Sequence, residues 1–374
     1  MIAVSSYMLI DSSCAVTGYV EDLCGNLCAD SESIALQCRK FGVAAIRDTG
    51  SGIAASFRFN ANLNPVRLIG GTVTITDSTP LSRSEIVIAN RSQLDGIVSL
   101  CLATGERWIG VRSSRPDFFQ AVWETANPKG ISVSGRGSGA LKATRLGHVQ
   151  IIDGVAALLP SQSSPREALT SASNVKEDSW SELTNTLLEH GVPICTGLVS
   201  LRRAVFLKEA IQAPYLQELS SIVPHTRYLQ QMRQGMGYLT GKRALEAHSG
   251  MREPTGKERQ GLDKGWERLV GWIGNAAQAG VIFLPASKAP QLAVIPGYGL
   301  LEELALLAHI GISAADTVTL ATTTAAEIFG IQAIPGKLAI RRAYSKNPAK
   351  ENTLGATEIS ELNRDSLLSL TPAG

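Results

Sequence analysis

Histidine is scarce in this chain, and cysteine is not much more frequent. Only five histidines occur among the 374 residues, at positions 148, 190, 225, 248 and 309. The six cysteines are too few for a disulfide framework in a chain of this length, so we expect reduced thiols in a cytoplasmic protein. A histidine-rich metal centre would have to be built from very few ligands.

Long apolar runs and a strong charge of one sign are also lacking. No run of about 18 uninterrupted apolar residues occurs, so we expect no membrane-spanning helix. The net charge of +2 gives no electrostatic reason to expect nucleic acid or an anionic membrane as a partner. No basic segment precedes the short apolar run at the N-terminus, so we expect no secretory signal.

Short β-branched apolar runs alternate with longer amphipathic runs along the chain. We expect strands at 3–10, 43–48, 66–76, 107–111, 131–135, 149–153, 192–199 and 281–285. We expect helices at 32–41, 92–103, 116–126, 137–146, 180–190 and 260–279. About eight such alternations predict an α/β fold with parallel strands, closed into a (β/α)8 TIM barrel. A doubly wound open sheet is the alternative, although no strand–GxGxxG–helix unit lies early in the chain to favour it.

Domain boundaries are expected where the alternation of strands and helices stops. We expect residues 1–330 to form the barrel and residues 331–374 to form a C-terminal extension. Residues 200–258 interrupt the pattern and are expected to form a lid-like insertion over the mouth of the barrel. The Ser- and Pro-rich stretch 156–179 is expected to be a surface loop.

Four segments carry a resemblance to a known family. They are "GVAAIRDTG" (42–50), "TRLGHVQIIDG" (144–154), "NTLLEHGVPICTGLVS" (185–200) and "GYGLLEELALLAHIGISAADTVTLATTTAAEIFGI" (297–331), the last followed by Ile334, Pro335, Gly336 and Lys337. In order and spacing they resemble the amidohydrolase superfamily, particularly its imidazolonepropionase and cyclic-dipeptidase-like branch. The resemblance implies an amidohydrolase-like barrel, with the usual β-sandwich domain absent or vestigial.

The metal ligands that the resemblance implies are missing. Family members hold one or two divalent metals through His-x-His after the first strand, a lysine after the fourth, histidines after the fifth and sixth, and an aspartate after the eighth. The corresponding positions here are Ser13 and Ala15, Gly110, Ser134, Asp153 and Ser287. None of these windows contains a histidine, so we expect a degenerate member with no metal and no other cofactor.

The ends of the expected strands carry the candidate catalytic residues, because barrel enzymes work there. Asp153 stands where the family has an inward-pointing histidine, and a lone carboxylate of raised pKa would be a general acid or base. Asp11 ends the first expected strand, although its role could be structural. His225 could reach the mouth from the insertion. Cys14 is either a nucleophile or an inert buried thiol.

Cations at the same strand ends suggest how substrate is bound. Arg112, Arg136 and Lys288 follow the fourth, fifth and eighth expected strands and could bind an anionic or enolate-like ligand, or be solvated loop charges. The remaining candidates for substrate binding are Ser13, Ser134, Ser287 and Tyr228. The Gly-rich stretch 134–143 could cradle an anion or simply start a helix.

These residues favour a metal-independent enzyme that acts on a small, anionic or aromatic molecule. Its acid–base chemistry would be cyclisation, elimination, isomerisation or hydrolysis. The first alternative is a non-catalytic binding or scaffold subunit, with a second copy of the chain or another protein as partner. The second alternative is a metal-dependent C–N hydrolase with displaced ligands.

Overall fold

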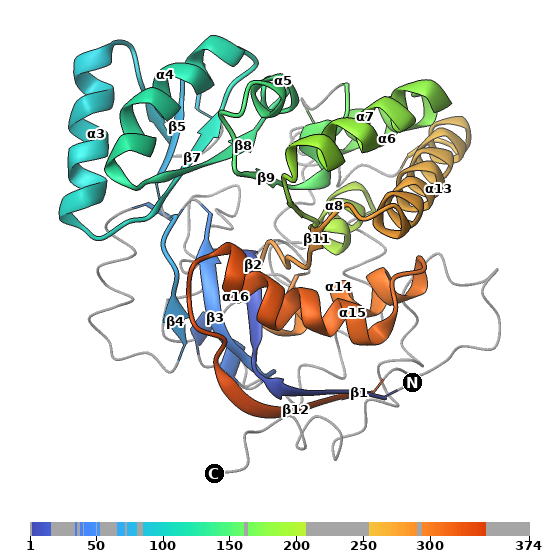
Figure 1. Ribbon diagram of the computed structural model, residues 1–374. Helices are drawn as coiled ribbons and strands as arrows, with labels where there is room; N and C mark the ends of the chain where they lie inside the picture. Colours follow the sequence, from blue (N-terminus) through green and yellow to red (C-terminus); the bar gives the residue numbers. More distant parts are fainter. Residues whose placement is uncertain are drawn as a thin grey trace, which may run out of the picture.

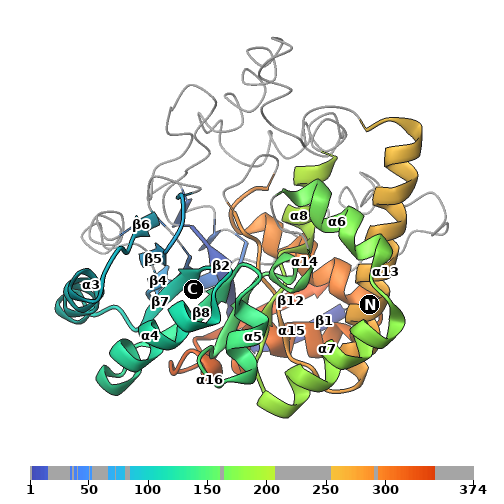
Figure 2. The same ribbon diagram turned by 90° about the horizontal axis from the view of Figure 1, so that it is seen from above.

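Parallel strands form the centre of the protein, and helices cover them from outside (Figures 1 and 2). The computed structural model describes residues 2–15, 34–35, 38–39, 41–49, 51–52, 66–71, 73–80, 85–160, 164–206, 254–289 and 294–341. The largest sheet has seven parallel strands in the order β11-β10-β9-β8-β7-β5-β6. These strands are β5 (Val73–Thr76), β6 (Glu85–Val87), β7 (Trp108–Arg112), β8 (Ser132–Arg136), β9 (Ile151–Asp153), β10 (Ile194–Cys195) and β11 (Phe283–Leu284).

Two smaller sheets contain the remaining described strands. β2 (Leu9–Cys14), β3 (Val43–Asp48) and β4 (Arg67–Leu68) form a parallel sheet. β1 (Ile2–Tyr7) pairs antiparallel with β12 (Pro335–Arg341). The predicted strand 3–10 is therefore split: it covers most of β1 and the first two residues of β2, which belongs to a different sheet. Asp11 consequently lies within β2 rather than after it.

The helices in the described part of the chain mostly follow the predicted ones. They are α3 (Arg91–Ala103), α4 (Pro116–Ala126), α5 (Ala140–Arg145), α6 (Pro165–Asn174), α7 (Glu177–His190), α8 (Leu198–Val205), α13 (Gly256–Gln278), α14 (Tyr298–His309), α15 (Ala314–Thr319) and α16 (Ala325–Ile328). The five residues between α15 and α16 form a π-helical turn, and short 3-10 turns follow α4 and β9.

Two sequence predictions fail locally for identifiable reasons. The segment 156–179 is not a loop throughout, because α6 begins there: Ser164 caps Glu167 N, and Pro165 occupies the first helical turn. The predicted strand 192–199 is reduced to β10, because Gly197 adopts φ +68° and starts α8.

The expected closed ring of eight strands is not confirmed. The predicted strand 66–76 is split, with β4 pairing with β3 and β5 pairing with β6 and β7. At the break, a Cβ on Gly71 would lie 2.6 Å from the carbonyl oxygen of Asp48. β2 and β11 share no ladder, but backbone bonds link Ser12 N to Pro285 O (3.3 Å) and Lys288 N to Ser13 O (2.8 Å). The fold is an α/β fold of parallel sheets whose strand ends meet on one side.

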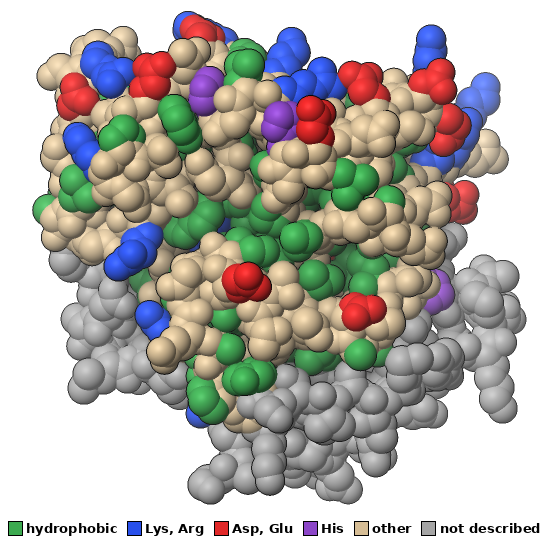
Figure 3. All heavy atoms as spheres, viewed as in Figure 1, with side chains coloured by type: hydrophobic (Ala, Val, Ile, Leu, Met, Phe, Trp, Pro, Cys, Tyr) green, Lys and Arg blue, Asp and Glu red, His purple; other side chains and the backbone are tan. Residues whose placement is uncertain are grey.

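Apolar side chains fill both sides of the large sheet. Outside it, Trp180 of α7 stacks on Trp272 of α13, which packs edge-on against Phe283 of β11. Inside it, a smaller cluster includes Ile10, Ala45, Ile151, Cys195 and Leu284. Basic and acidic side chains are interspersed along the upper edge of the face in Figure 3. In the described part of the chain, no helix is long and apolar enough to cross a membrane.

Candidate functional site

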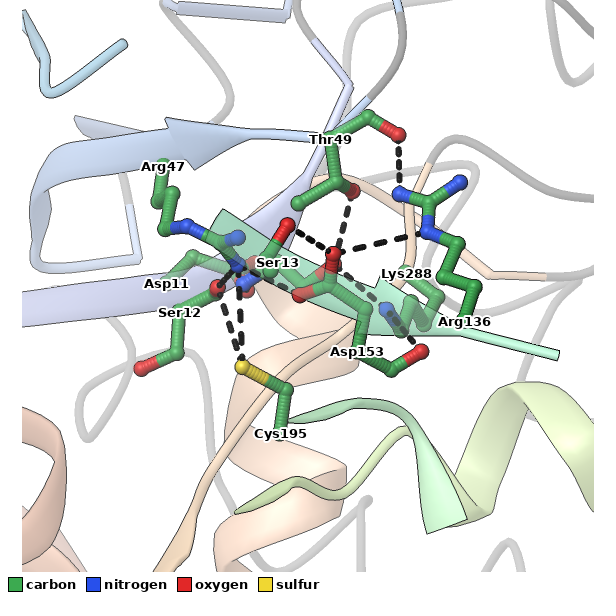
Figure 4. A network of polar contacts seen from close by, with 10 residues as sticks. Asp11, Ser12, Ser13, Arg47, Thr49, Arg136, Asp153, Cys195 and Lys288 are labelled. Carbon is green, nitrogen blue, oxygen red and sulfur yellow. Dashed lines mark hydrogen bonds and ion pairs between the residues drawn. The ribbon is translucent and has the colours of Figure 1, made fainter. Parts of the chain in front are cut away.

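Polar and charged side chains gather where the parallel strands end (Figure 4). They come from β2, β8, β9, β10, from β3 and the residue after it, and from the segment after β11, which the sheet order and backbone bonds bring together. Most of the predicted candidates are among them. The strand-end cluster comprises Asp11, Ser13, Arg47, Thr49, Ser134, Arg136, Asp153, Cys195, Ser287 and Lys288.

Asp153, the last residue of β9, is the centre of this cluster. Its Oδ1 accepts from Arg47 Nη1 at 2.6 Å, and its Oδ2 accepts from Ser134 Oγ at 2.7 Å. Arg136 Nε lies 3.5 Å from Oδ2. Burial opposes ionisation of Asp153, but Arg47, Arg136 and Lys288 together hold its pKa below the usual range. The predicted lone carboxylate of raised pKa is therefore wrong: Asp153 is ionised and paired.

Arg47 is the functional candidate that sequence reasoning missed. Its side chain is 1% exposed, donates to Ser12 O at 3.2 Å as well as to Asp153, and lies 5.0 Å from the centre of the Trp108 ring. The sequence signal for Arg47 is the alternation in "VAAIRD", because strand residues two apart share a face. Arg47 follows Ala45 on the face of β3 that turns toward the smaller apolar cluster.

Lys288 reaches back from the segment after β11 to the end of β2. Its Nζ donates to Ser13 Oγ at 2.6 Å and to Asp153 O at 3.3 Å. Burial lowers the pKa of Lys288 to about 8, although nearby Asp153 opposes that shift. Lys288 is the one described non-glycine residue with positive φ, at 56°. Its stem also needs Gly197, where an added Cβ would lie 2.7 Å from Lys288 Cγ.

Glu303 of α14 fixes the turn against which Lys288 packs. Its Oε1 and Oε2 accept from Leu198 N and Val199 N, both at 2.8 Å, at the start of α8. Burial raises the pKa of Glu303 to about 7, against these hydrogen bonds. This carboxylate acts as a helix cap supplied by a distant element, which no local sequence signal could reveal.

Asp11 lies on the other side of the cluster and orients Ser287. Its Oδ1 accepts from Ser287 N at 3.0 Å, and its Oδ2 accepts from Ser287 Oγ at 2.5 Å. The side chain is fully buried, and this burial raises the pKa of Asp11 to about 6 despite the hydrogen bonds. Asp11 thus holds the β2 end against the segment after β11, which is a positioning role.

Two groups of predicted residues lie elsewhere. Arg112 does not join the cluster, because Glu85 of β6 binds its guanidinium through two bonds of 2.9 and 2.7 Å. β6 was not among the predicted strands, so this partner was not foreseen. His225 and Tyr228, with the rest of the insertion from 207 to 253, lie outside the described residues.

The Gly-rich stretch and Cys14 have structural roles. A Cβ on Gly137 or Gly139 would lie 2.7 or 2.8 Å from Ser113 O, so these glycines allow close packing against the end of β7. Gly139 N donates to that same oxygen. Cys14 is fully buried, and its pKa is raised by a hydrogen bond with Cys38 and by burial, so Cys14 is a protonated thiol.

A divalent metal does not fit the strand-end cluster. Among the described residues, no group of three or more His, Cys, Asp or Glu side chains could hold a metal ion. Arg47, Arg136 and Lys288 instead surround the buried Asp153 carboxylate. The described histidines lie away from the cluster, with His148 against Trp123 and the other two at the ends of α7 and α14.

Comparison with known proteins identifies the fold. No family model and no curated protein matches the sequence. Solved amidohydrolase structures share the fold of the chain at low sequence identity, which confirms at the level of the fold the resemblance seen in the sequence. The chain therefore shares the fold of these amidohydrolase structures.

Three of these structures show how similar the folds are and how much of each chain is covered. Bottromycin amidohydrolase superimposes with a TM-score of 0.62 at 16% identity, covering 95% of this chain and 74% of that one. Ochratoxinase from A. niger gives 0.53 at 14% identity, covering 93% and 78%. A Xaa-Pro dipeptidase with methionine bound in its active site gives 0.53 at 14% identity, covering 92% and 82%.

Proposed function

We propose that the protein is a metal-independent hydrolase of a small anionic molecule, acting at the strand-end cluster. The observation that carries the proposal is the convergence of Arg47, Arg136 and Lys288 on Asp153 at the ends of the strands. While Lys288 is protonated, three cations against the two carboxylates Asp153 and Asp11 leave one positive charge, and the partly exposed guanidinium of Arg136 stays charged when Lys288 is neutral. That charge suits a carboxylate on the substrate or an oxyanion that forms during hydrolysis.

The neighbours in fold support hydrolysis over the other reactions considered. Their names describe an amidohydrolase, an ochratoxinase and a dipeptidase. Because the identities are 14 to 16%, the names bear on this chain only as support for a hydrolase-type reaction. Arg136, whose side chain is 24% exposed, is the cation best placed to meet substrate.

The test is turnover of small amides, esters and lactones that carry a carboxylate, by protein dialysed against a metal chelator. We expect hydrolysis that neither the chelator nor added zinc changes, and that falls at least about 100-fold in Arg136→Gln. Arg112→Gln is the matched control, because Arg112 ends the neighbouring strand but is held by Glu85. Activity that chelation abolishes and zinc restores would refute the proposal.

A second candidate function is a non-catalytic binding subunit. Both carboxylate oxygens of Asp153 are already bonded within the protein, as in a buried network that stabilises a fold. In that case the same substrates would show no turnover, and Arg136→Gln would change stability or ligand binding only.

A further inference from the structure

Ser13 and Lys288 form a close pair at the partly exposed edge of the strand-end cluster. The Lys288 Nζ to Ser13 Oγ distance is 2.6 Å, and Ser13 Oγ is 2.7 Å from Thr49 Oγ1. When Lys288 is protonated it donates to Ser13 Oγ, and either hydroxyl can be the donor in the Ser13–Thr49 bond. When Lys288 is neutral, its lone pair faces the Ser13 hydroxyl at the same distance.

We propose that Ser13 is a nucleophile activated by Lys288 and forms an acyl-enzyme with an ester or amide substrate. This inference rests on the proposed hydrolase function and specifies its mechanism. A serine needs an adjacent base to become nucleophilic, and serine–lysine pairs meet that need without a histidine. Among the described residues, none of the histidines contacts the cluster.

The surroundings of Lys288 suit a base rather than a permanent ammonium ion. Lys288 is held by a backbone of φ 56°, a conformation that costs energy for a residue with a side chain. Gly197 leaves room for its stem, and burial lowers the pKa of Lys288 to about 8. Arg136 and Arg47 lie nearby and also oppose a positive charge there, whereas Asp153 favours one. With a pKa of about 8, roughly a tenth of Lys288 is neutral at pH 7, and this fraction grows as pH rises.

The step balances without a further reactant. Neutral Lys288 Nζ takes the Ser13 Oγ proton as Oγ bonds to the substrate carbonyl carbon. The bond from that carbon to the leaving nitrogen or oxygen then breaks, and Lys288 returns the proton to the leaving group. Water attacks the acyl-Ser13 ester, gives its proton to Lys288, and Ser13 is released protonated. Arg136 donates to Thr49 O, beside Ser13, so its exposed part can face the oxyanion.

Ser13 is fully buried, and its Oγ is bonded to Thr49 and Lys288, which are both half-buried. In the proposed mechanism, substrate would have to approach Ser13 from the side of these two residues. A substrate carbonyl reaches Ser13 Oγ only when the Thr49 hydroxyl turns away. Removing that hydroxyl in Thr49→Ala should therefore raise the rate of acylation, as long as Ser13 and not Thr49 is the nucleophile.

The test measures covalent modification of the full chain by p-nitrophenyl acetate and by a small alkyl fluorophosphonate, with intact-mass and peptide mass spectrometry. We expect one adduct on Ser13, formed faster as pH rises with a midpoint near the Lys288 pKa of about 8. Ser13→Ala should form no adduct, and Ser13→Cys should form a thioester. Lys288→Arg, which keeps a cation but provides no base, should lower the rate at least about 100-fold.

Ser113→Ala is the matched control and should be modified like the parent protein, because Ser113 is a buried serine at the end of β7, outside the cluster. An adduct on Thr49 or Lys288, or none with either probe, would overturn the inference. Metal-free hydrolysis that persists in Ser13→Ala would also overturn it while leaving the proposed function intact. A Ser13 adduct without turnover of any substrate would instead contradict the proposed function alone.

Discussion

Replacing Arg47 with methionine tests the central electrostatic contact of the protein. Arg47 and Asp153 are both 1% exposed and lie 2.6 Å apart, so Arg47→Met leaves a buried carboxylate without its main partner. Removing one partner of a buried ion pair costs about 3–5 kcal/mol. Ser134 and Arg136 still face Asp153, which places the expected loss near the lower end of that range. Methionine keeps most of the apolar contact with Trp108 and Phe329.

The assay is denaturant unfolding of four proteins: the parent, Arg47→Met, Asp153→Asn and the double variant. We expect Asp153→Asn to recover a large part of the stability lost in Arg47→Met, because the amide needs no counter-charge. Coupling between residues in contact amounts to about 0.5–3 kcal/mol and should lie at the upper end here. Arg47→Lys, which keeps the charge, should lose less stability than Arg47→Met. A loss below about 1 kcal/mol in Arg47→Met, or strictly additive single effects, would refute this account of the pair.

The pH dependence of the unfolding free energy gives an independent check that Arg47 stabilises the ionised form of Asp153. The pKa of Asp153 is lowered in the folded protein, so its contribution to stability is present above the unfolded pKa of about 3.9 and is lost as pH falls through the folded value. In Arg47→Met the pKa of Asp153 must rise. The difference in unfolding free energy between parent and variant should therefore shrink as pH falls from about 7 toward 4. A difference that grows over this range would contradict the pairing.

Other predictions concern the surroundings of the cluster. The pKa of Asp11 is raised to about 6 in the folded protein, so the stability that Asp11 contributes is present below its unfolded pKa and is lost as pH rises through 6. The melting temperature of Asp11→Asn should therefore rise relative to that of the parent between pH 5 and 8. Gly197→Ala should displace Lys288 and slow acylation of Ser13 by about 10-fold or more, at a cost of about 1 kcal/mol in stability. Glu85→Gln should lower the free energy of unfolding by about 1 kcal/mol, through loss of the ion pair with Arg112, and should leave the rate of Ser13 acylation unchanged. Elemental analysis of the purified protein should find no stoichiometric zinc, manganese or iron.

Most residues of the strand-end cluster could be predicted from the sequence, because the ends of the strands could be located from it. The β-branched runs before Arg136 and Asp153 ended where expected, and parallel pairing of β8 with β9 brings such ends together. Ser134 and Arg136, two apart on one strand, share a face and both reach Asp153. Lys288 could be placed at the same edge, but not with its Nζ on Ser13, because its φ of 56° is unusual for a lysine.

What the sequence could not supply were contacts made by distant elements. Whether Arg47 or Asp48 faces the inner cluster depends on strand register, and a shift of one residue exchanges them. Gly197 starts α8 with help from Glu303, more than a hundred residues later, so the end of β10 was not visible locally. The split of the third predicted strand at Gly71 likewise depends on close approach to Asp48.

The charges at the strand ends bear on whether the strand-end cluster could hold a divalent ion. At an effective dielectric constant of 20, unit charges about 4 Å apart interact by about 4 kcal/mol, and a divalent ion doubles this. With every charge set at that same distance for comparison, three cations would repel such an ion by roughly 24 kcal/mol, whereas two carboxylates would attract it by roughly 16 kcal/mol. Repulsion wins while Lys288 is protonated, and the guanidinium groups of Arg47 and Arg136 do not lose their protons. Under the proposed hydrolase function, the base must therefore come from the one cation of the cluster that can be deprotonated, Lys288.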